Sequence, residues 1–347
     1  MKKFNFSKSI LDWYDKAGRK DLPWQKRITP YRVWVSEIML QQTQVATVIP
    51  YYLKFMESFP SIKILSAAPL EKVLHHWSGL GYYARARNLH KMSRIVDQQF
   101  NGNIPLTFDE LIKLPGIGRS TAGAILALSD NQKYAILDGN VKRVLSRFHA
   151  IKGWPGKRKT ENTLWELSCG HLPEDRVASY TQAMMDLGAT VCVRANPKCQ
   201  MCPIKSTCIA HARSEENVYP HKKKMKNKPH RTVRVVLLLA KNKVLLEQRP
   251  ASGIWGGLSS LPELREDEHI EKWCRQRFKM PPIGINKKRK FRHAFSHYTL
   301  DIEPIEVRVD DASCKLKLNS NEYWYMLNRP AEVGLAAPVK KLLQNVS

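Results

Sequence analysis

Four cysteines crowd into one short stretch of the chain, and this cluster limits the possible fold more than any other feature. The spacing is C-x6-C-x2-C-x5-C, and its members are Cys192, Cys199, Cys202 and Cys208. Pro197 and Pro203 keep the intervening chain from forming a helix, so the thiols can converge on one centre. Four thiolates in so short a loop suit a tetrahedral zinc ion and an iron–sulfur cluster equally well. The spacing therefore predicts a metal centre on the loop at 192–208.

The cysteines also indicate the compartment. Their total of seven is odd, and the clustering fits metal chemistry in a reducing environment better than a set of disulfides. Asp12 and Asp15 interrupt the apolar stretch that a signal peptide would need. The apolar run at 233–240 has the length of a strand rather than of a membrane span. We expect a soluble, cytoplasmic, monomeric protein with no membrane partner.

Charge predicts the class of partner. The chain has 57 Lys and Arg against 31 Asp and Glu, a formal net charge of +26. Residues 1–212 carry 30 basic and 16 acidic side chains (+14), and residues 213–347 carry 27 and 15 (+12). A hydrophobic content of 43% excludes a disordered polyampholyte. Both halves suit one extended polyanion, and nucleic acid is a better fit than a membrane surface or an acidic protein.

The period of the apolar residues changes along the chain. Up to residue 212 they recur at helical spacing, as in Leu111–Leu114, Ala122–Leu128 and Val141–Phe148. Short β-like runs follow from residue 232: Thr232–Leu239, Lys243–Gln248, His297–Ile302, Ile305–Val309 and Glu322–Leu327. The stretch between them is basic, contains prolines and has almost no apolar residue. We predict a helical domain at 1–212, a linker at 213–231 and an α+β domain at 232–347.

A glycine-containing hairpin joins two helical segments within the first domain. Gly116 and Gly118 allow a turn with positive φ and let backbone N–H groups approach an anion. The helix that begins near Ser120 would point its positive end at the same anion. We predict a seat for a nucleic-acid phosphate here, next to Arg119. An ordinary helix-capping turn remains the alternative.

Two carboxylates stand where acid–base chemistry is possible. Glu37 lies in an apolar helical run, where desolvation would raise its pKa toward that of a general acid. The alternative for Glu37 is a wet helix face. Asp138 precedes a helix and could simply cap it, but a capping carboxylate that stays ionised can also oppose a developing cation. A proton donor with a fixed anion suits cleavage of a glycosidic bond.

Several stretches together resemble one known family. They are residues 36–44 (SEIMLQQTQ), 79–89 (GLGYYARARNL) and 137–141 (LDGNV), followed by the cysteine loop. In this order, with the hairpin, they resemble the helix–hairpin–helix DNA glycosylase superfamily, and most closely its adenine DNA glycosylases of the MutY type. The resemblance covers nearly the whole chain.

The resemblance implies a fold, a cofactor and a reaction. The fold would be mainly α, with a helix–hairpin–helix glycosylase domain and its iron–sulfur loop followed by an α+β Nudix-like domain. The four cysteines would hold a [4Fe–4S] cluster. The enzyme would bind duplex DNA and, in base-excision repair, remove adenine mispaired with 8-oxoguanine or guanine.

The resemblance also implies roles for single residues. Glu37 would protonate the flipped adenine, and Asp138 would stabilise the sugar cation with support from Asn140. Gln42 and Tyr82 would wedge into the duplex beside the oxidised guanine and replace the stacking that is lost on base flipping. Without the resemblance, Gln42 and Tyr82 would be interpreted as a solvated polar residue and a packed loop tyrosine.

One position separates two activities within the superfamily. In the endonuclease III branch, a lysine in the hairpin attacks the sugar and cleaves the strand. Here that position is Ser120, which cannot form a Schiff base. We expect a monofunctional glycosylase in which Ser120 supports the site and Lys142 contacts a phosphate. Some relatives have tyrosine at the Ser120 position, where it hydrogen-bonds the catalytic aspartate.

The second domain resembles a Nudix domain that has lost its hydrolase chemistry. Residues 256–258 and 262–263 match the start of a Nudix box, but the acidic pairs that would bind Mg²⁺ have no counterpart in Glu263–Phe278. The resemblance assigns 8-oxoguanine recognition to Phe295, Ser296 and His297. The basic run at 287–292 is either a solvated loop or a phosphate contact.

Two other functions remain open at this point. One is an endonuclease III-like glycosylase/lyase that acts on oxidised pyrimidines. The other is an iron–sulfur DNA-binding protein or redox sensor without catalysis.

Overall fold

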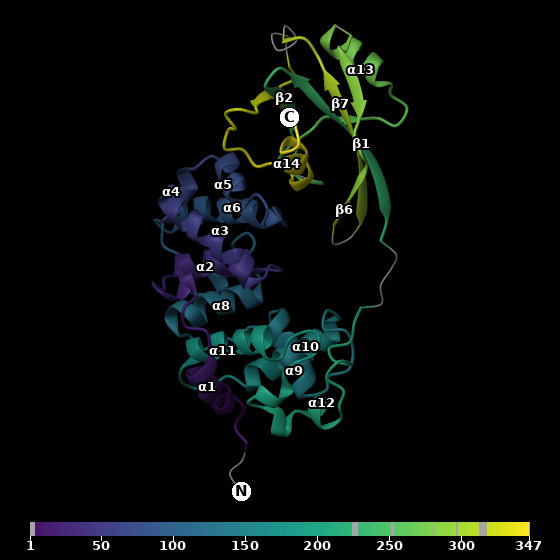
Figure 1. The fold of residues 1–347 in the computed structure, drawn as a ribbon. Helices are drawn as coiled ribbons and strands as arrows, with labels where there is room; N and C mark the ends of the chain where they lie inside the picture. The colour runs from purple at the N-terminus through teal and green to yellow at the C-terminus, as the bar shows by residue number, and fades with distance from the viewer. Residues whose placement is uncertain are drawn as a thin grey trace. The chain divides into compact units, whose positions relative to one another are not determined.

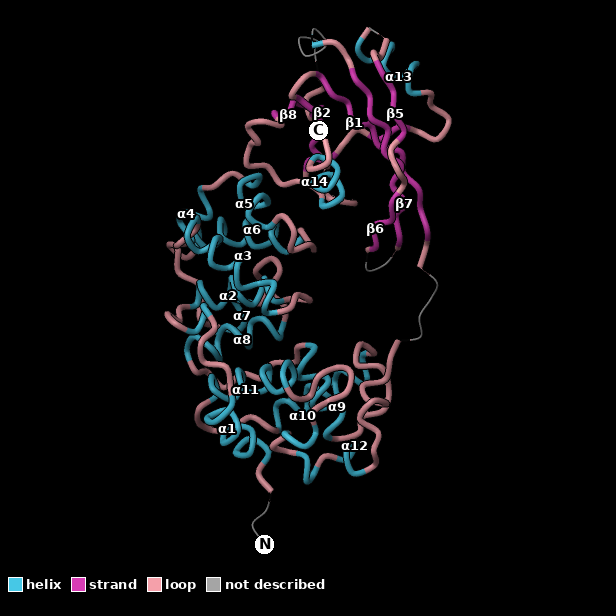
Figure 2. Tube along the Cα trace, in the orientation of Figure 1, coloured by secondary structure: helices cyan, strands magenta, loops and turns pink. Residues whose placement is uncertain are grey.

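Helices form the N-terminal part of the chain and strands the C-terminal part. The computed structural model describes residues 4–223, 228–250, 253–279, 281–295, 298–311 and 318–346. Contacts between Cα atoms divide the chain into two units, Met1–Ala67 with Asn88–Met225 and Ala68–Arg87 with Lys226–Ser347. Figures 1 and 2 show helices in the first unit and strands, with a few helices, in the second. The expected fold class is thus confirmed, whereas the domain boundaries at 212 and 232 stay predictions.

The N-terminal part contains twelve α-helices among the described residues, and three of them begin at a residue whose side chain caps the helix. Their bounds are α1 (Phe6–Ala17), α2 (Pro30–Leu40), α3 (Val45–Ser58), α4 (Ile62–Ala67), α5 (Leu70–Trp77), α6 (Ala84–Gln99), α7 (Phe108–Leu111), α8 (Arg119–Asp130), α9 (Gly139–Phe148), α10 (Arg158–Gly170), α11 (Val177–Thr190) and α12 (Ile209–Ala212). Asn5, Thr29 and Asp138 accept backbone N–H bonds at the starts of α1, α2 and α9. Pro30 occupies the first position of α2, where its missing N–H costs nothing.

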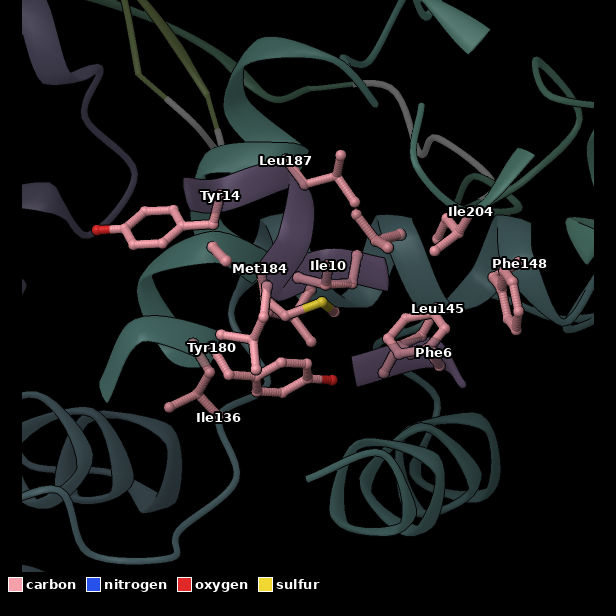
Figure 3. Close-up of a cluster of buried hydrophobic side chains, with 14 of the residues drawn as sticks. Phe6, Ile10, Tyr14, Ile136, Leu145, Phe148, Tyr180, Met184, Leu187 and Ile204 are labelled. Carbon is pink, nitrogen blue, oxygen red and sulfur yellow. The ribbon is translucent and has the colours of Figure 1, made fainter. Parts of the chain in front are cut away.

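One apolar core positions the helix that carries Asp138. Figure 3 shows its buried side chains, to which α1, α9 and α11 contribute Phe6, Ile10, Tyr14, Leu145, Phe148, Tyr180, Met184 and Leu187. Burying each large apolar side chain stabilises the fold by about 1.5–3 kcal/mol. Helix α11 also packs against α8, and α8 packs against α2. The starts of α8 and α9 and the middle of α2 are therefore held in one rigid unit.

The second unit is built on a mixed sheet. Its strands are β1 (His230–Ala240), β2 (Lys243–Gln248), β3 (Ser259–Ser260), β4 (Glu263–Leu264), β5 (Gly284–Lys287), β6 (Phe291–Ala294), β7 (Thr299–Arg308) and β8 (Glu322–Met326). The main order is β3-β2-β1-β7-β5, and β1 runs parallel to β7. Two further helices are α13 (Ile270–Phe278) and α14 (Ala337–Leu343). Helix α13 buries Trp273 and Phe278 against the sheet.

The structure corrects the predicted strands in two places. The runs predicted at 297–302 and 305–309 belong, where described, to the single strand β7. Pro304 stays within this strand because its carbonyl still accepts a bond from the Lys288 N–H, at 2.9 Å. The sequence did not predict strands β5 and β6 or helix α13. For β5 the reason is that all its residues are exposed and show no clear alternation of apolar and polar side chains.

The first part of the predicted linker packs against the helical unit. Tyr219 is buried, and Nε of Arg147 donates to the carbonyl oxygens of Glu216 and Tyr219 at 2.7 and 3.0 Å. His221 accepts from the Gly153 N–H at 3.2 Å. Among the described residues, no helix combines the length and the apolar character that a membrane crossing requires.

Candidate active site and metal centre

Glu37 lies in α2 among buried neighbours. Ser36 and Ile38 on either side are buried, and the Glu37 side chain itself is half-buried. Burial, and then the negative charge of Asp138, raises the pKa of Glu37 to about 8. The carboxyl group is therefore mostly protonated at neutral pH. That is the state which a general acid needs.

Asp138 caps α9 and faces the same site. Its Oδ1 accepts from the Val141 N–H at 2.8 Å, and its Oδ2 accepts from Nδ2 of Asn140 at 3.2 Å. Burial raises the pKa of Asp138, although these bonds and the nearby Arg143 lower it. The negative charge of Asp138 adds to the rise in the pKa of Glu37, so the two carboxyls are close enough to interact. The structure thus brings both predicted catalytic residues into one electrostatic unit.

Ser120 supports this unit through the backbone. Its Oγ accepts from the N–H of Leu137 at 2.9 Å, one residue before Asp138. Nearby, Nε2 of Gln41 lies 3.4 Å from Oγ1 of Thr121 and links the end of α2 to the start of α8. Ser120 therefore holds the segment that carries Asp138 through the Leu137 amide.

The predicted phosphate seat has two different glycines. Gly116 has φ +84°, and a Cβ there would lie 2.9 Å from Cβ of Asn88. Gly118 caps α8, and a Cβ there would meet no atom within 4 Å. The exposed backbone at Gly118 is thus open to an approaching anion, whereas Gly116 is needed to make the turn.

The two predicted basic contacts near the hairpin already have partners. The guanidinium of Arg119 lies 4.0 Å from the ring centroid of Trp165 and keeps its charge at an exposed position. Nζ of Lys142 lies 2.6 Å from Oε1 of Glu161. A phosphate would have to compete with Glu161 for Lys142. Arg119 stacks on Trp165 and forms no salt bridge with a carboxylate among the described residues, so a phosphate could pair with it directly.

Both predicted wedge residues have an uncommon backbone conformation. Gln42 has φ +58° and Tyr82 has φ +50°, in the left-handed region that side chains other than glycine seldom adopt. Both are exposed, and Tyr82 keeps 45% of its surface accessible. Such strain at exposed aromatic and amide side chains is typical of functional positions.

Phe295 lies at the hairpin between β6 and β7. Its N–H donates to the carbonyl of Tyr298 at 2.9 Å, and the two rings stack with centroids 4.4 Å apart. Ser296 and His297, the other two residues assigned to 8-oxoguanine recognition, lie outside the described residues.

The basic run at 287–292 is largely paired. Lys288 contacts Glu306 at 2.7 Å, and Lys290 contacts Glu303 at 3.1 Å. Arg292 contacts Asp301 at 2.7 Å. These acidic partners all lie on β7, so Lys288, Lys290 and Arg292 form a ladder of ion pairs along this strand rather than a patch of uncompensated cations.

The four cysteines of the loop at 192–208 line one pocket with apolar neighbours. They share it with residues that include Val144, Leu187, Val191 and Ile204. All four thiols are free and half-buried. Burial raises the pKa of Cys199 to about 11 and of Cys202 to about 12, with the other thiolates adding to the effect. Thiolates can persist in such a pocket only beside strong positive charge, which a metal centre supplies.

A second feature of the loop is a group of three different ligands. Among the described residues, one group of metal-ligating side chains has ligand atoms that all lie within 4.8 Å of one another. Its members are Cys199, His211 and Glu216. Nδ1 of His211 lies 2.6 Å from Oε1 of Glu216. The loop is therefore a cysteine-containing candidate metal site.

Two arginines of α9 were missed by sequence analysis. Nη2 of Arg143 donates to Oδ1 of Asn140 at 2.8 Å, and its Nε donates to the Cys192 carbonyl at 2.7 Å. Arg147 is 3% exposed and donates to the carbonyls of Val193 and Arg194, and to Sγ of Cys192 at 3.3 Å. The helix capped by Asp138 is thereby bonded to the cysteine loop. Only their spacing of four residues on one helix face could have signalled this pair.

Comparison with known proteins identifies the family. The HhH-GPD superfamily base excision DNA repair protein matches residues 35–168, and the NUDIX domain matches residues 234–345. The adenine DNA glycosylase of Buchnera aphidicola subsp. Acyrthosiphon pisum (strain APS) is 42% identical over 348 residues, which cover 99% of this chain and 98% of the relative. The chain belongs to the adenine DNA glycosylase family. The adenine DNA glycosylase of Homo sapiens is 44% identical over 220 residues, covering 61% of this chain and 40% of the relative.

Solved structures agree with the fold. A thermostable thymine-DNA glycosylase is 26% identical with a TM-score of 0.55, and the match covers 60% of this chain and 95% of that one. A trapped endonuclease III–DNA covalent intermediate is 22% identical with a TM-score of 0.52, covering 60% and 94%. The resemblance stated from the sequence and the enzyme class, a DNA N-glycosylase, are confirmed.

Proposed function

We propose that this protein is a monofunctional DNA glycosylase that removes adenine mispaired with 8-oxoguanine or guanine in duplex DNA, acting as a monomer. The observation that carries the proposal is the coupling of Glu37 to Asp138, one carboxyl held protonated beside another that caps a helix. The adenine specificity follows that of the relatives that match nearly the full chain.

In the proposed reaction the two carboxyls have different tasks. Glu37 gives its proton to the flipped adenine as the N-glycosidic bond breaks, and the base leaves neutral. Asp138 is the ionised carboxylate of the two, and its negative charge stabilises the positive charge that develops on the sugar. Water then adds to the sugar carbon and gives a proton to the Glu37 carboxylate, which returns the acid to its starting state. The bonds from Val141 and Asn140 keep the Asp138 carboxylate aimed from the start of α9.

The proposed cofactor is a [4Fe–4S] cluster held by Cys192, Cys199, Cys202 and Cys208. The four cysteines line one pocket, so their thiols can reach a single centre. The resemblance to the MutY-type glycosylases favours the iron–sulfur cluster over a zinc ion. When bound, the cluster would supply a rigid cross-link within the loop, which Arg143 and Arg147 connect to α9.

The absence of strand cleavage rests on Ser120. A hydroxyl that accepts from the Leu137 amide cannot attack the sugar as an amine would. The lysine nearest to Asp138 in sequence is Lys142, and its Nζ is engaged by Glu161. We expect base release without strand scission.

The second domain is proposed to read the oxidised guanine rather than to hydrolyse nucleotides. Phe295, one of the three residues assigned to this recognition, is held by stacking on Tyr298. Between residues 253 and 279, as far as the chain is described, no cluster of acidic side chains is arranged as a metal site. We expect no phosphate release from oxidised nucleotides with Mg²⁺.

Base-release kinetics test the proposed function. End-labelled A:8-oxoguanine, A:G and A:C duplexes are incubated under single-turnover conditions, with and without alkali. Glu37→Gln and Asp138→Asn should fold normally and lose about 10²–10⁴-fold in rate. Strand scission without alkali would contradict the monofunctional reading, and full activity of Asp138→Asn would contradict the mechanism.

A further inference from the structure

The turn that carries Tyr82 is braced by a buried arginine. Arg85 is 9% exposed, and its Nη2 donates to the Gly81 carbonyl at 3.1 Å. Its guanidinium lies 5.5 Å from the ring centroid of Trp77 and 5.4 Å from that of Tyr82. Nε1 of Trp77 donates to the same Gly81 carbonyl at 3.2 Å. The backbone that holds Tyr82 at φ +50° is thus fixed from two sides.

A second arginine ties this turn to the strand-containing domain. Nη1 of Arg87 donates to the carbonyl of Gly256 at 2.6 Å. The contact lies inside the second unit, because residues 68–87 group with the C-terminal part of the chain. Two weaker bonds run in parallel with it, from Oγ of Ser78 to the Leu335 carbonyl at 3.2 Å and between Nδ1 of His75 and the Val333 carbonyl at 3.2 Å.

Gly256, which accepts the bond from Arg87, is next in sequence to a residue that contacts Phe295. Gly256 follows Trp255, which is buried with φ +53°. The Trp255 ring centroid lies 5.8 Å from that of Phe295 and 6.1 Å from that of His293. Arg87 therefore connects the turn of the predicted wedge residue to an aromatic cluster formed by Trp255, His293, Phe295 and Tyr298.

We propose that Arg87 is a positioning residue for lesion discrimination: through Gly256 it joins the Tyr82 turn to the aromatic cluster, so that the wedge and the recognition hairpin meet an oxidised guanine as one body. The proposal rests on the function proposed above. Reading of the oxidised base then supports insertion of Tyr82, and an ordinary guanine gives no such support. Removal of the tie lowers the preference for 8-oxoguanine and leaves the carboxyl chemistry intact.

The test compares two substrates in Arg87→Ala, with Arg87→Lys and Arg94→Ala beside it. Single-turnover base release is measured on A:8-oxoguanine and A:G duplexes. We expect Arg87→Ala to lower the ratio of the A:8-oxoguanine rate to the A:G rate by at least about fivefold, which is the lower end of typical coupling between sites. The change should come mainly from slower release on the A:8-oxoguanine duplex. Arg87→Lys keeps a donor for Gly256 and should restore part of the ratio. Arg94 is exposed on the same helix, so Arg94→Ala should leave the ratio unchanged.

Hydrogen exchange separates this proposal from the function on which it rests. Arg87→Ala should speed amide exchange at 78–87 and at 253–258 together, with little change elsewhere. An equal loss of rate on both substrates, or exchange that rises at only one of the two segments, would overturn the positioning role. A wild-type enzyme without preference for 8-oxoguanine would overturn the role in discrimination, and one that releases adenine from neither duplex would overturn the proposed function. The exchange result would still decide whether the tie between the two segments exists.

Discussion

Glu37 owes its raised pKa to burial first and to the charge of Asp138 second. If Glu37 is the general acid, only its protonated form is active, so the rate of base release should be level below pH 8 and fall about tenfold per unit above it. Single-turnover release on A:8-oxoguanine from about pH 6 to 9.5 measures this profile. In Glu37→Gln the break near pH 8 should vanish.

The exposed Glu57 on α3 provides the matched control for Glu37. Glu57→Gln should reproduce the wild-type profile. A wild-type rate that stays level through pH 8–9 would remove Glu37 as the proton donor.

Arg147 makes a different residue-scale prediction. It donates to several loop carbonyls from a buried position, and each carbonyl left without a donor costs about 1–3 kcal/mol. Arg147→Ala should therefore lower the free energy of unfolding by about 3 kcal/mol or more and reduce the metal content per chain. Thermal unfolding and elemental analysis measure the two effects, with the exposed Arg158→Ala as control. Normal metal content in Arg147→Ala would contradict this role.

Residues that act through near neighbours in sequence could be predicted, and those that act across long separations could not. The four cysteines fall within seventeen positions, and Asp138 caps the helix that directly follows it. Arg147, by contrast, reaches carbonyls 46 and 72 residues away. Arg87 reaches one 169 residues away. Such partners emerge only when the chain folds, because an arginine in a helix has no sequence mark for what it meets.

At the scale of elements, strong periodicity and capping residues predicted well. Helices α8 and α9 and strand β2 follow their apolar pattern closely. Strand β7 was divided in two because Pro304 reads as a break, although its carbonyl keeps its place in the sheet. Strand β5 has four exposed residues and no apolar face, so only pairing with β7 defines it. The sequence signal fails where a neighbouring strand, rather than burial, decides the structure.

The hairpin between α7 and α8 offers a paired prediction on two glycines. Gly116→Ala places a Cβ against Asn88 at a positive φ and should destabilise the protein by about 1–2 kcal/mol. The methyl group of Gly118→Ala would meet no atom within 4 Å, so the free energy of unfolding should stay within about 0.5 kcal/mol of the wild-type value. The same methyl group would keep a phosphate away from the backbone, so DNA binding should weaken. Urea unfolding and duplex binding by fluorescence anisotropy measure both. Unchanged DNA affinity in Gly118→Ala would contradict a phosphate seat.

At the scale of the whole molecule, the count of 57 Lys and Arg overstates the number of cations that can contact DNA, because some of them already pair with carboxylates. Arg119 is exposed and stacks on Trp165, so its charge remains available, whereas Lys290 is paired with Glu303 at 3.1 Å and Asp301 at 3.4 Å. The logarithm of DNA affinity should fall linearly with the logarithm of salt concentration, with a slope set by the cations that contact phosphate. Arg119→Ala should reduce the magnitude of that slope by about 1.

Lys290→Ala is the matched control in the same titration, run from about 50 to 300 mM salt with one duplex. It removes the same formal charge as Arg119→Ala, so a binding mode that depends on net charge alone would change the slope equally in both variants. Unequal slopes indicate instead that local pairing decides which cations meet the DNA backbone. Because Glu306, Glu303 and Asp301 on β7 pair with Lys288, Lys290 and Arg292, we expect these three cations to contribute less to the salt dependence than Arg119, which stacks on Trp165.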